Sequence, residues 1–333
     1  MPGTPNRLVS ETAHPLLDRI AARPQLAALA GALFIGFSGI FYRYAEVSPE
    51  TATVFRSLYG LPVLGAVAWL ERRRFGGMPG SSVRLAALAG VFFAADLLLW
   101  HHAIEFIGAG LATVLGNLQV VVVALVAWVL LRERPAGTTL LALPVVVAGV
   151  VLISGVLDGD AYGKDPLLGV GLGILTALAY SSYLMVIRLV GRDLRRPAGP
   201  VFVSTAATAV VAAAYGALAG GLDPVPAWPS HGWLILVGIT SQSMGYVLIS
   251  IGLPRLPSAV TSIILLAQPV ATVALARVLL TEVPSSIQVA GIGLVIGGIA
   301  IATVPVSRLR DRARRRASSG PASENGADGS SSY

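Results

Sequence analysis

The sequence has no cysteine and little charge, and both absences limit what the protein can be. Without cysteine in its 333 residues, disulfides, thiolate metal sites and a cysteine nucleophile are excluded. Charged residues make up 12% of the chain, against about 25% in a soluble domain. Because 55% of the residues are hydrophobic and the mean hydropathy is +0.75, the chain cannot cover its surface with water-compatible groups. We expect it in a lipid bilayer.

Lysine and nucleotide-binding loops are also scarce. Of the 24 basic residues only Lys164 is lysine, a bias that suggests a GC-rich bacterial genome. The phosphate-binding pattern G-x-x-x-x-G-K-[ST] is absent, so ATP-driven transport by this chain is not expected. Only Glu105 stands at metal-ligand spacing from a histidine, His101, which is too few ligands for a metal site. We therefore expect neither a metal nor a cofactor.

Long apolar runs, in contrast, are abundant. A spanning helix needs about 20 mostly apolar residues, and ten such runs follow one another with short connections. No cleavable signal peptide is expected, because Glu11 and Asp18 interrupt any short apolar core before the first span. The predicted spans are 26–44, 50–70, 85–107, 109–131, 138–157, 166–187, 199–220, 231–253, 258–280 and 286–306.

The basic residues are distributed asymmetrically among the connections. With a cytoplasmic N-terminus, the inner segments hold 20 arginines, and only Lys164, Arg43 and Arg277 lie at the outer side. The longest outer loop, 158–165, is acidic. This positive-inside bias predicts that both termini are cytoplasmic in a bacterial inner membrane. It also accounts for the net charge of +7 without a nucleic-acid partner.

An internal repeat organises the apolar part of the chain. The stretch Leu118–Pro135 recurs 149 residues later as Ala267–Pro284, with Gln, Glu and Pro in register. Each repeat therefore has five helices, and because five is odd, the second repeat is inverted relative to the first. The predicted fold is an all-α integral membrane protein of ten helices in two inverted repeats. Its predicted parts are a cytoplasmic segment 1–24, a first repeat 25–157, an outer loop 158–165, a second repeat 166–306 and a disordered basic tail 307–333.

Several motifs resemble a known family. An arginine lies early in the second span, in ATVFRSLYG, and the fourth span reads A-T-V-L-G-N-L-Q and then E-R-P. With the two five-helix halves, the chain resembles EamA-type members of the drug/metabolite transporter superfamily over about 26–306. The resemblance implies a secondary transporter or exporter of small metabolites and not an enzyme. One departure is that the fourth span has Gln119-Val120 where the ninth has Gln268-Pro269, so we expect a bend in the ninth span and less of one in the fourth.

Charged residues within spans are candidates for function, because they are rare and costly in a bilayer. Asp96 lies near the middle of the third span, with Trp100 one turn away on the same face. It could bind a substrate amine or exchange a proton, and His101 is a second candidate for proton coupling; alternatively, Asp96 hydrogen-bonds a neighbouring helix. Arg56 could pair with Asp96, bind an anionic substrate or extend outward to the interface.

Uncharged polar and aromatic residues complete the predicted site. Amides within spans either bridge helices or face a substrate. Aromatic walls with a few hydroxyls and amides suit a small amphipathic solute, including an organic cation. Ordinary packing is the alternative interpretation. The substrate-binding candidates in these groups are Asn117, Gln119, Tyr180, Tyr183, Gln242, Tyr246 and Gln268.

Three functions are compatible with such a chain. The first is a secondary active transporter, with export as the expected direction, in which two inverted halves rock around a midplane cavity and a proton or solute gradient drives transport. The second is a channel or lipid scramblase. The third, an intramembrane enzyme, is disfavoured because Asp96 and His101 diverge around the helix. Expected partners are a small-molecule substrate, the lipid bilayer and, through glycines at four-residue spacing, a second copy of the chain.

Overall fold

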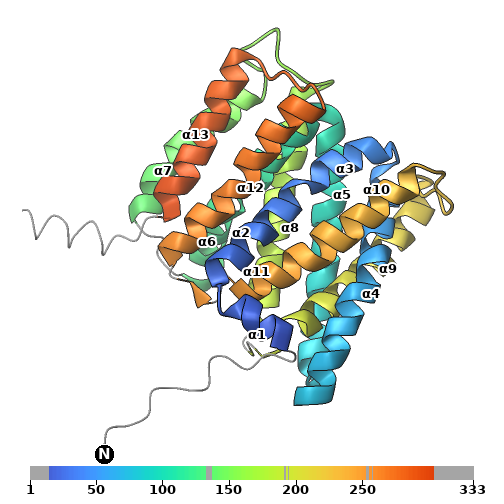
Figure 1. Cartoon of the computed structure of the whole chain (residues 1–333). Coiled ribbons are helices and arrows are strands. Elements are labelled where there is room, and N and C mark those ends of the chain that lie inside the picture. Colours follow the sequence, from blue (N-terminus) through green and yellow to red (C-terminus); the bar gives the residue numbers. More distant parts are fainter. Residues whose placement is uncertain are drawn as a thin grey trace, which may run out of the picture.

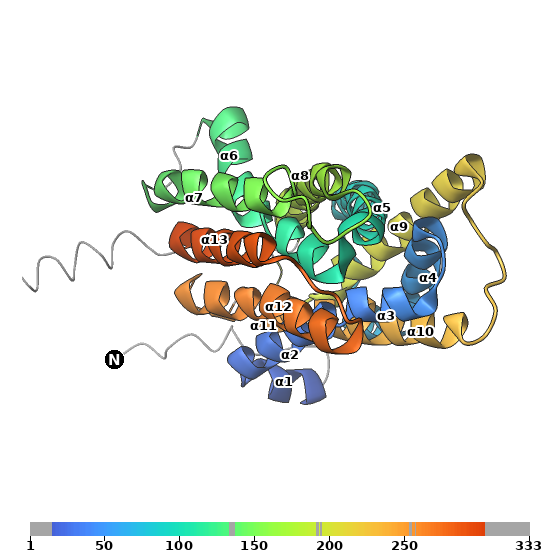
Figure 2. The same cartoon turned by 90° about the horizontal axis from the view of Figure 1, so that it is seen from above.

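The computed structural model describes residues 15–132, 137–190, 193, 195–252, 255–256 and 258–303. Within these ranges all regular elements are helices, which cross one another in the bundle of Figures 1 and 2. The all-α prediction is therefore confirmed for the described residues. The predicted tail 307–333 and most of the predicted N-terminal segment lie outside them.

The described part of the first half forms seven α-helices. The described part of the second half forms six α-helices, and a π-helix, η2, lies between two of them, α10 and α11. In the first half the bounds are α1 Pro15–Ala21, α2 Pro24–Gly36, α3 Ser38–Ala45, α4 Pro49–Phe75, α5 Gly80–Gly116, α6 Gln119–Leu131 and α7 Gly137–Ile153. In the second half they are α8 Pro166–Val190, α9 Ala198–Ala219, α10 Ser230–Val237, η2 Gly238–Gly245, α11 Tyr246–Gly252, α12 Ser258–Leu279 and α13 Ser286–Thr303.

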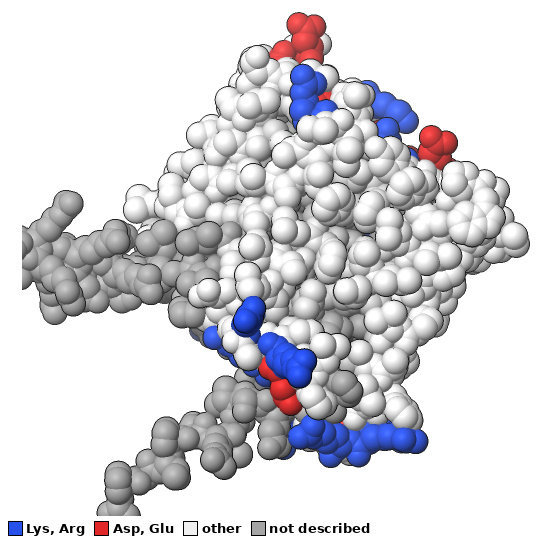
Figure 3. All heavy atoms as spheres, viewed as in Figure 1, with Lys and Arg blue, Asp and Glu red and all other residues white. Residues whose placement is uncertain are grey.

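Six helical segments among the described residues are long and apolar enough to cross a membrane. They are α2 with α3, α4, α5, α8, α9, and α10 continuing through η2 into α11. Three shorter apolar helices lie at Gly137–Ile153, Ile264–Leu279 and Ser286–Ala302. On the face shown in Figure 3, a wide uncharged belt separates charged groups at the two ends. This distribution is typical of a bilayer-spanning protein, while the count of ten spans stays a prediction.

The fourth predicted span is interrupted, contrary to the expectation that it would be the straighter of the pair. The first part of this span is the last segment of α5, which follows a sharp turn at Gly108 (φ 81°). The span is then interrupted between Gly116, where α5 ends, and Gln119, where α6 begins. At this break the Asn117 side chain donates to the Thr113 carbonyl oxygen at 2.8 Å, and the Leu118 amide bonds the Leu115 carbonyl three residues back. The Thr113 carbonyl thus accepts both the side chain and, at 3.2 Å, the backbone amide of Asn117, and side-chain bonds of this kind often bend helices without any proline. In the ninth predicted span, α12 is continuous through Pro269.

The helices of the two halves pack closely against each other. α5 contacts α8 and α9, α4 contacts α9, and α7 lies beside α13 in both views (Figures 1 and 2). At the α7–α13 crossing, a Cβ atom on Gly149 would lie 2.8 Å from the Gly291 carbonyl oxygen. The two helix backbones are therefore in direct contact at these glycines, with no side chain between them. Gly293 and Gly297, in contrast, have no described neighbour within 4 Å.

Candidate binding cavity

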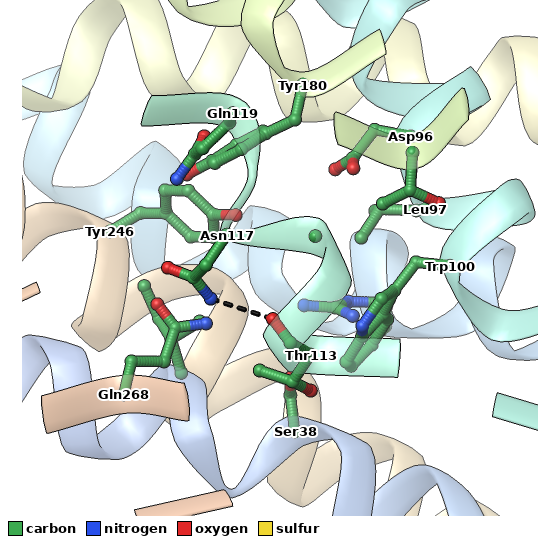
Figure 4. A pocket seen from close by; sticks show the side chains of 14 residues that line it. Ser38, Asp96, Leu97, Trp100, Thr113, Asn117, Gln119, Tyr180, Tyr246 and Gln268 are labelled. Carbon is green, nitrogen blue, oxygen red and sulfur yellow. Dashed lines mark hydrogen bonds between the residues drawn. The ribbon is translucent and has the colours of Figure 1, made fainter. Parts of the chain in front are cut away.

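A small cavity lies where the two halves of the bundle meet (Figure 4). Its volume is about 60 Å³, and its wall comes from helices of both halves. Eight of the ten predicted substrate-binding residues are on the wall: Arg56, Asp96, Trp100, Asn117, Gln119, Tyr180, Tyr246 and Gln268. The sequence did not single out the other six lining residues, which are Ile35, Ser38, Leu97, Thr113, Gly116 and Thr176.

Arg56 is buried in the bundle and does not reach outward. Its side chain is 2% exposed on α4, its Nε donates to Gln242 Oε1 at 3.1 Å, and its guanidinium lies 5.9 Å from the centre of the Trp100 ring. Its Nη1 atom is buried without a hydrogen-bond partner in the described part of the chain. The proposed extension to the interface is therefore wrong, and a buried cationic donor is left free beside the cavity.

Gln242 contacts Arg56 and is not on the cavity wall, so its predicted role in substrate binding stays a prediction. The residue is fully buried in η2, where the helix is wound into the wider π form that often marks functional sites. While its Oε1 accepts from Arg56, its Nε2 donates to Thr205 Oγ1 on α9 at 3.1 Å. Both ends of the amide are thus fixed, and Arg56 is held in one orientation.

Asp96 shares the cavity with Arg56, but the two residues do not form the direct pair that was one of the predicted alternatives. It lies on α5, is 6% exposed, and points into the space next to Leu97 and Trp100 (Figure 4). Among the described residues, no hydrogen bond or direct ion pair engages its carboxylate, including any with Arg56. Two opposite charges therefore face one small volume without neutralising each other directly.

The rest of the polar wall is only partly hydrogen-bonded. Asn117 is occupied by its bond to Thr113, whereas Gln119 Oε1 and Thr176 Oγ1 are buried without a partner among the described residues. The Gln268 side chain lines the cavity, and its backbone carbonyl accepts from Thr272 at 3.0 Å. Unpaired buried acceptors are uncommon in folded proteins, and here they border the same cavity as the free donor of Arg56.

The aromatic residues form a stack of which only part is on the wall. Tyr180 and Tyr246 line the cavity, and behind them Tyr183 stacks on Phe93 at 4.5 Å and on Tyr180 at 5.6 Å between ring centres. Tyr183 is 2% exposed and belongs to the hydrophobic core. Tyr183 is therefore not on the cavity wall but supports the ring of Tyr180, and its role in substrate binding stays a prediction.

His101 lies outside the cavity wall as well. It is 1% exposed, its Nδ1 is 2.8 Å from Thr53 Oγ1, and its ring packs between Tyr42 and Trp100. It therefore has no contact with the cavity through which to exchange a proton with a solute. His102, its neighbour, lies 3.5 Å from Glu50. Within the described residues, no three His, Asp or Glu side chains gather as a metal site would require.

Glu282 follows the end of α12 and is buried, although it lies where an apolar run of the sequence ends. It is 3% exposed between α12 and α13, and it accepts the backbone amides of Ala109 at 2.7 Å and Gly110 at 3.1 Å. These amides start the segment of α5 that follows the turn at Gly108. Burial raises the pKa of the Glu282 carboxyl, although both hydrogen bonds and the charge of Arg43 act to lower it. Its repeat counterpart, Glu133, lies outside the described residues.

Glu71 makes a similar contact that the sequence did not suggest. It lies in the last turns of α4, is 2% exposed, and accepts the amides of Ala198 and Gly199 at 2.8 Å each, at the start of α9. A carboxylate at a helix start satisfies amides that have no partner inside the helix. Neither contact could be inferred from spacing, because each joins residues more than 120 positions apart.

Comparisons with known proteins agree with this fold. The model of the EamA-like transporter family matches the chain twice, over residues 23–155 and 167–304. A solved structure described only as "Crystal structure of protein" is similar at a TM-score of 0.60 and 20% identity, covering 86% of this chain and 99% of that one, which bears on the fold alone. No curated protein matches the chain. Because the family model covers most of the sequence in two copies, the chain belongs to the EamA-like transporter family and is a multi-pass membrane protein of the drug/metabolite transporter superfamily.

Proposed function

We propose that the protein is a secondary active transporter that moves a small solute by alternating access, with export as its direction. The observation that carries this proposal is the central cavity, which has a free cationic donor and a free carboxylate, within the described part of the chain, at the contact of the two halves. Buried charges without partners are costly in a membrane protein, so their retention points to a ligand. Inverted repeats supply two mirror-related ways to close such a cavity.

The orientation and coupling belong to the same proposal. The arginine bias supports an inner membrane of a bacterium with both termini in the cytoplasm. Asp96 is the group we expect to carry a coupling proton, because among the described residues it is the one carboxylate on the cavity wall. We prefer Asp96 to His101, the second predicted candidate, because His101 packs against Trp100 outside the cavity wall.

Flux through the purified protein in liposomes tests the function. Proteoliposomes are screened with labelled amino acids, organic cations and nucleosides under an imposed proton gradient. The proposal expects saturable flux of at least one solute that depends on the gradient, and it expects Asp96→Asn to remove the gradient dependence. Asp160→Asn, in an exposed loop, is the matched control.

Two outcomes would contradict the proposal. Flux that does not saturate and is not stimulated by solute on the opposite side would indicate a channel, and movement of labelled lipid between leaflets would indicate a scramblase. If Asp96→Asn left both transport and its pH dependence unchanged, the coupling role would be wrong.

A further inference from the structure

We propose that a groove at one end of the bundle, which we call the basic groove, binds an anionic phospholipid of the surrounding membrane. The basic groove shares no lining residue with the central cavity. Its wall is formed by the last turns of α4, the connection to α5 with the first turn of that helix, and the start of α9. Because α4 and α9 belong to different halves, a lipid in this groove contacts both halves of the molecule.

The floor of the basic groove is apolar and has the size of a ligand site. Its volume is about 360 Å³, and ligand sites have volumes of about 300–1,000 Å³. The floor is open to the outside, because the side chain of Trp69 is 49% exposed and that of Val83 is 39% exposed. In membrane proteins, exposed tryptophans are enriched at the level of the lipid headgroups. The apolar residues that form the floor include Ala68, Trp69, Val83, Phe202 and Val203.

The rim of the basic groove carries a cation that has no partner in the described part of the chain. Arg72 is exposed and lines the groove, and no described residue forms a hydrogen bond or an ion pair with its side chain. Arg73 lies over the Trp69 ring, with its guanidinium 3.7 Å from the ring centre. An arginine guanidinium pairs with a phosphate through two parallel hydrogen bonds. A phosphate above an apolar floor is the arrangement that a phospholipid headgroup and its first methylene groups supply.

The two carboxylates beside this rim are engaged by other groups and do not neutralise Arg72. Glu71 accepts two backbone amides at the start of α9, at 2.8 Å each. Asp193 lies within 3.3 Å of the guanidinium groups of Arg195 and Arg196. The positive charge of Arg72 is therefore available to an anion from outside the chain.

The charge of this end of the molecule favours such an anion. Arg72, Arg73 and Arg74 follow one another in the last turn of α4, and basic side chains gather at the end of the molecule at which α4 ends (Figures 1 and 3). Cations at the C-terminus of a helix are stabilised by its dipole, which explains their charge but not the apolar groove beside them. Basic residues next to a membrane span attract anionic lipids, and a bound phosphate reduces the repulsion among the three arginines.

Other occupants fit only one part of the basic groove. A soluble anion pairs with Arg72 but leaves the apolar floor exposed to water, which is unfavourable. A zwitterionic lipid covers the floor but brings its own cationic group close to the arginines. A second copy of the chain would place two clusters of arginines against each other, and like charges across an interface oppose association. An anionic phospholipid matches both the floor and the rim.

Native mass spectrometry of the full-length protein, released from detergent, tests the proposal. Dioleoyl-phosphatidylglycerol and dioleoyl-phosphatidylcholine have the same acyl chains, and each is titrated separately to give the dissociation constant of the first bound lipid. We expect phosphatidylglycerol to bind about tenfold more tightly, which corresponds to one hydrogen-bonded pair of charged groups. Equal affinities for the two lipids would overturn the proposal.

A variant of the rim assigns this preference to the basic groove. Arg72→Gln should weaken phosphatidylglycerol binding about tenfold and leave phosphatidylcholine binding unchanged. Arg84→Gln and Arg188→Gln are the matched controls, because they remove the same charge from exposed positions at the same end that are not on the groove wall. Both controls should bind like the wild type. An equal loss of the preference in the controls would show a general attraction to the basic surface, and the groove would not be the site.

Two further readings of the experiment distinguish the other occupants. Glycerol 3-phosphate, a soluble phosphate ester without acyl chains, should not displace phosphatidylglycerol at millimolar concentration. Displacement would identify a site for soluble anions and overturn the proposal. The spectra also report the oligomeric state, and a dimer that forms without lipid and is disrupted by Trp69→Ala would show that a second copy covers the groove, which would overturn it as well.

Discussion

The buried charges at the centre of the molecule differ from those at its ends. At the centre, Arg56 keeps a donor without a described partner, and the Asp96 carboxylate accepts no hydrogen bond from a described residue. Towards the ends of the helices, Glu71 and Glu282 are as deeply buried, but each accepts two backbone amides at 2.7–3.1 Å. Buried charged side chains thus lack hydrogen-bond partners at the cavity, where a solute can bind, and they accept backbone hydrogen bonds where one helix is joined to another.

The contacts at the ends also connect the two repeats. Glu71 of the first repeat holds the start of α9, and Glu282 of the second repeat holds the segment of α5 that follows Gly108. Removing an end carboxylate should therefore reduce stability, whereas removing a central charge should reduce binding. Four measurements test this difference, ordered from the largest expected change in stability to the smallest.

Glu282→Ala should destabilise the protein most, together with Glu71→Ala. Each variant leaves two buried amides without an acceptor, at about 1–3 kcal/mol for each amide. Chemical unfolding in detergent should therefore show a loss of about 2–6 kcal/mol in either variant. Asp160→Ala in the exposed loop is the control. A loss no larger than that of the control would show that the end carboxylates do not hold the helices.

Gly108→Ala should have the next largest effect. At Gly108, with φ 81°, a Cβ atom would lie 2.7 Å from the Glu282 carboxylate, so the substitution adds a clash to the backbone strain. Gly76 has the same φ of 81° and no described neighbour within 4 Å, so Gly76→Ala measures the strain alone. We expect Gly108→Ala to lose about 1–3 kcal/mol more than Gly76→Ala in the same unfolding experiment. Equal losses would mean that Glu282 does not occupy this space.

The pH dependence of stability should change in Glu282→Gln. Since burial raises the pKa of Glu282 above its ordinary value of 4.5, the folded protein binds this proton more tightly than the unfolded chain does. The resulting stabilisation is fully present below about pH 4.5 and is lost as pH rises through the folded-state pKa. The Glu282→Gln variant carries a neutral amide throughout this range. Between pH 4 and 8, the unfolding free energy of the wild type should therefore fall relative to that of Glu282→Gln. We expect this fall to be smaller than the stability loss caused by Glu282→Ala. A constant difference between the two proteins would contradict the shift.

Asp96→Asn should change stability least while abolishing coupled transport. No described residue donates a hydrogen bond to the Asp96 carboxylate, so the nearly isosteric amide removes a buried charge without breaking a contact. Unfolding free energy should stay within about 0.5 kcal/mol of the wild type, or rise. A loss as large as that of Glu282→Ala would show that Asp96 is structural, and the contrast between centre and ends would disappear.

Much of the cavity could be predicted from the sequence because polarity within an apolar run is informative. Asp96, Trp100, Gln119 and Gln268 stand out in this way, and they meet at one cavity. The functional role of these residues stays a prediction. The repeat is also visible, because Gln, Glu and Pro recur in register, and the family model matches the chain twice.

The errors concern contacts between distant parts of the chain. Gln242 and Tyr183 are polar residues in spans, but they support Arg56 and Tyr180 from behind, which only tertiary packing decides. Glu282 ends an apolar run, and its contacts with two distant backbone amides, which spacing along the chain does not reveal, hold it in a buried position.

The break in the fourth span has a local cause that proline content does not reveal. At the break, the Thr113 carbonyl accepts the side chain of Asn117 as well as its backbone amide, whereas the proline in the sequence favours a bend in the ninth span. An asparagine within an apolar run is compatible with an intact helix or a broken one, and its side-chain conformation decides between them.

Solute counterflow tests the central claim most directly. Proteoliposomes are loaded with an excess of the unlabelled solute that the flux screen identifies, and a trace of the same solute in labelled form is added outside. A carrier with one cavity reached from one side at a time must accumulate the label transiently above its equilibrium level, and Arg56→Gln must remove this overshoot while Arg84→Gln keeps it. Uptake in the wild type that rises only to passive equilibration would contradict the account.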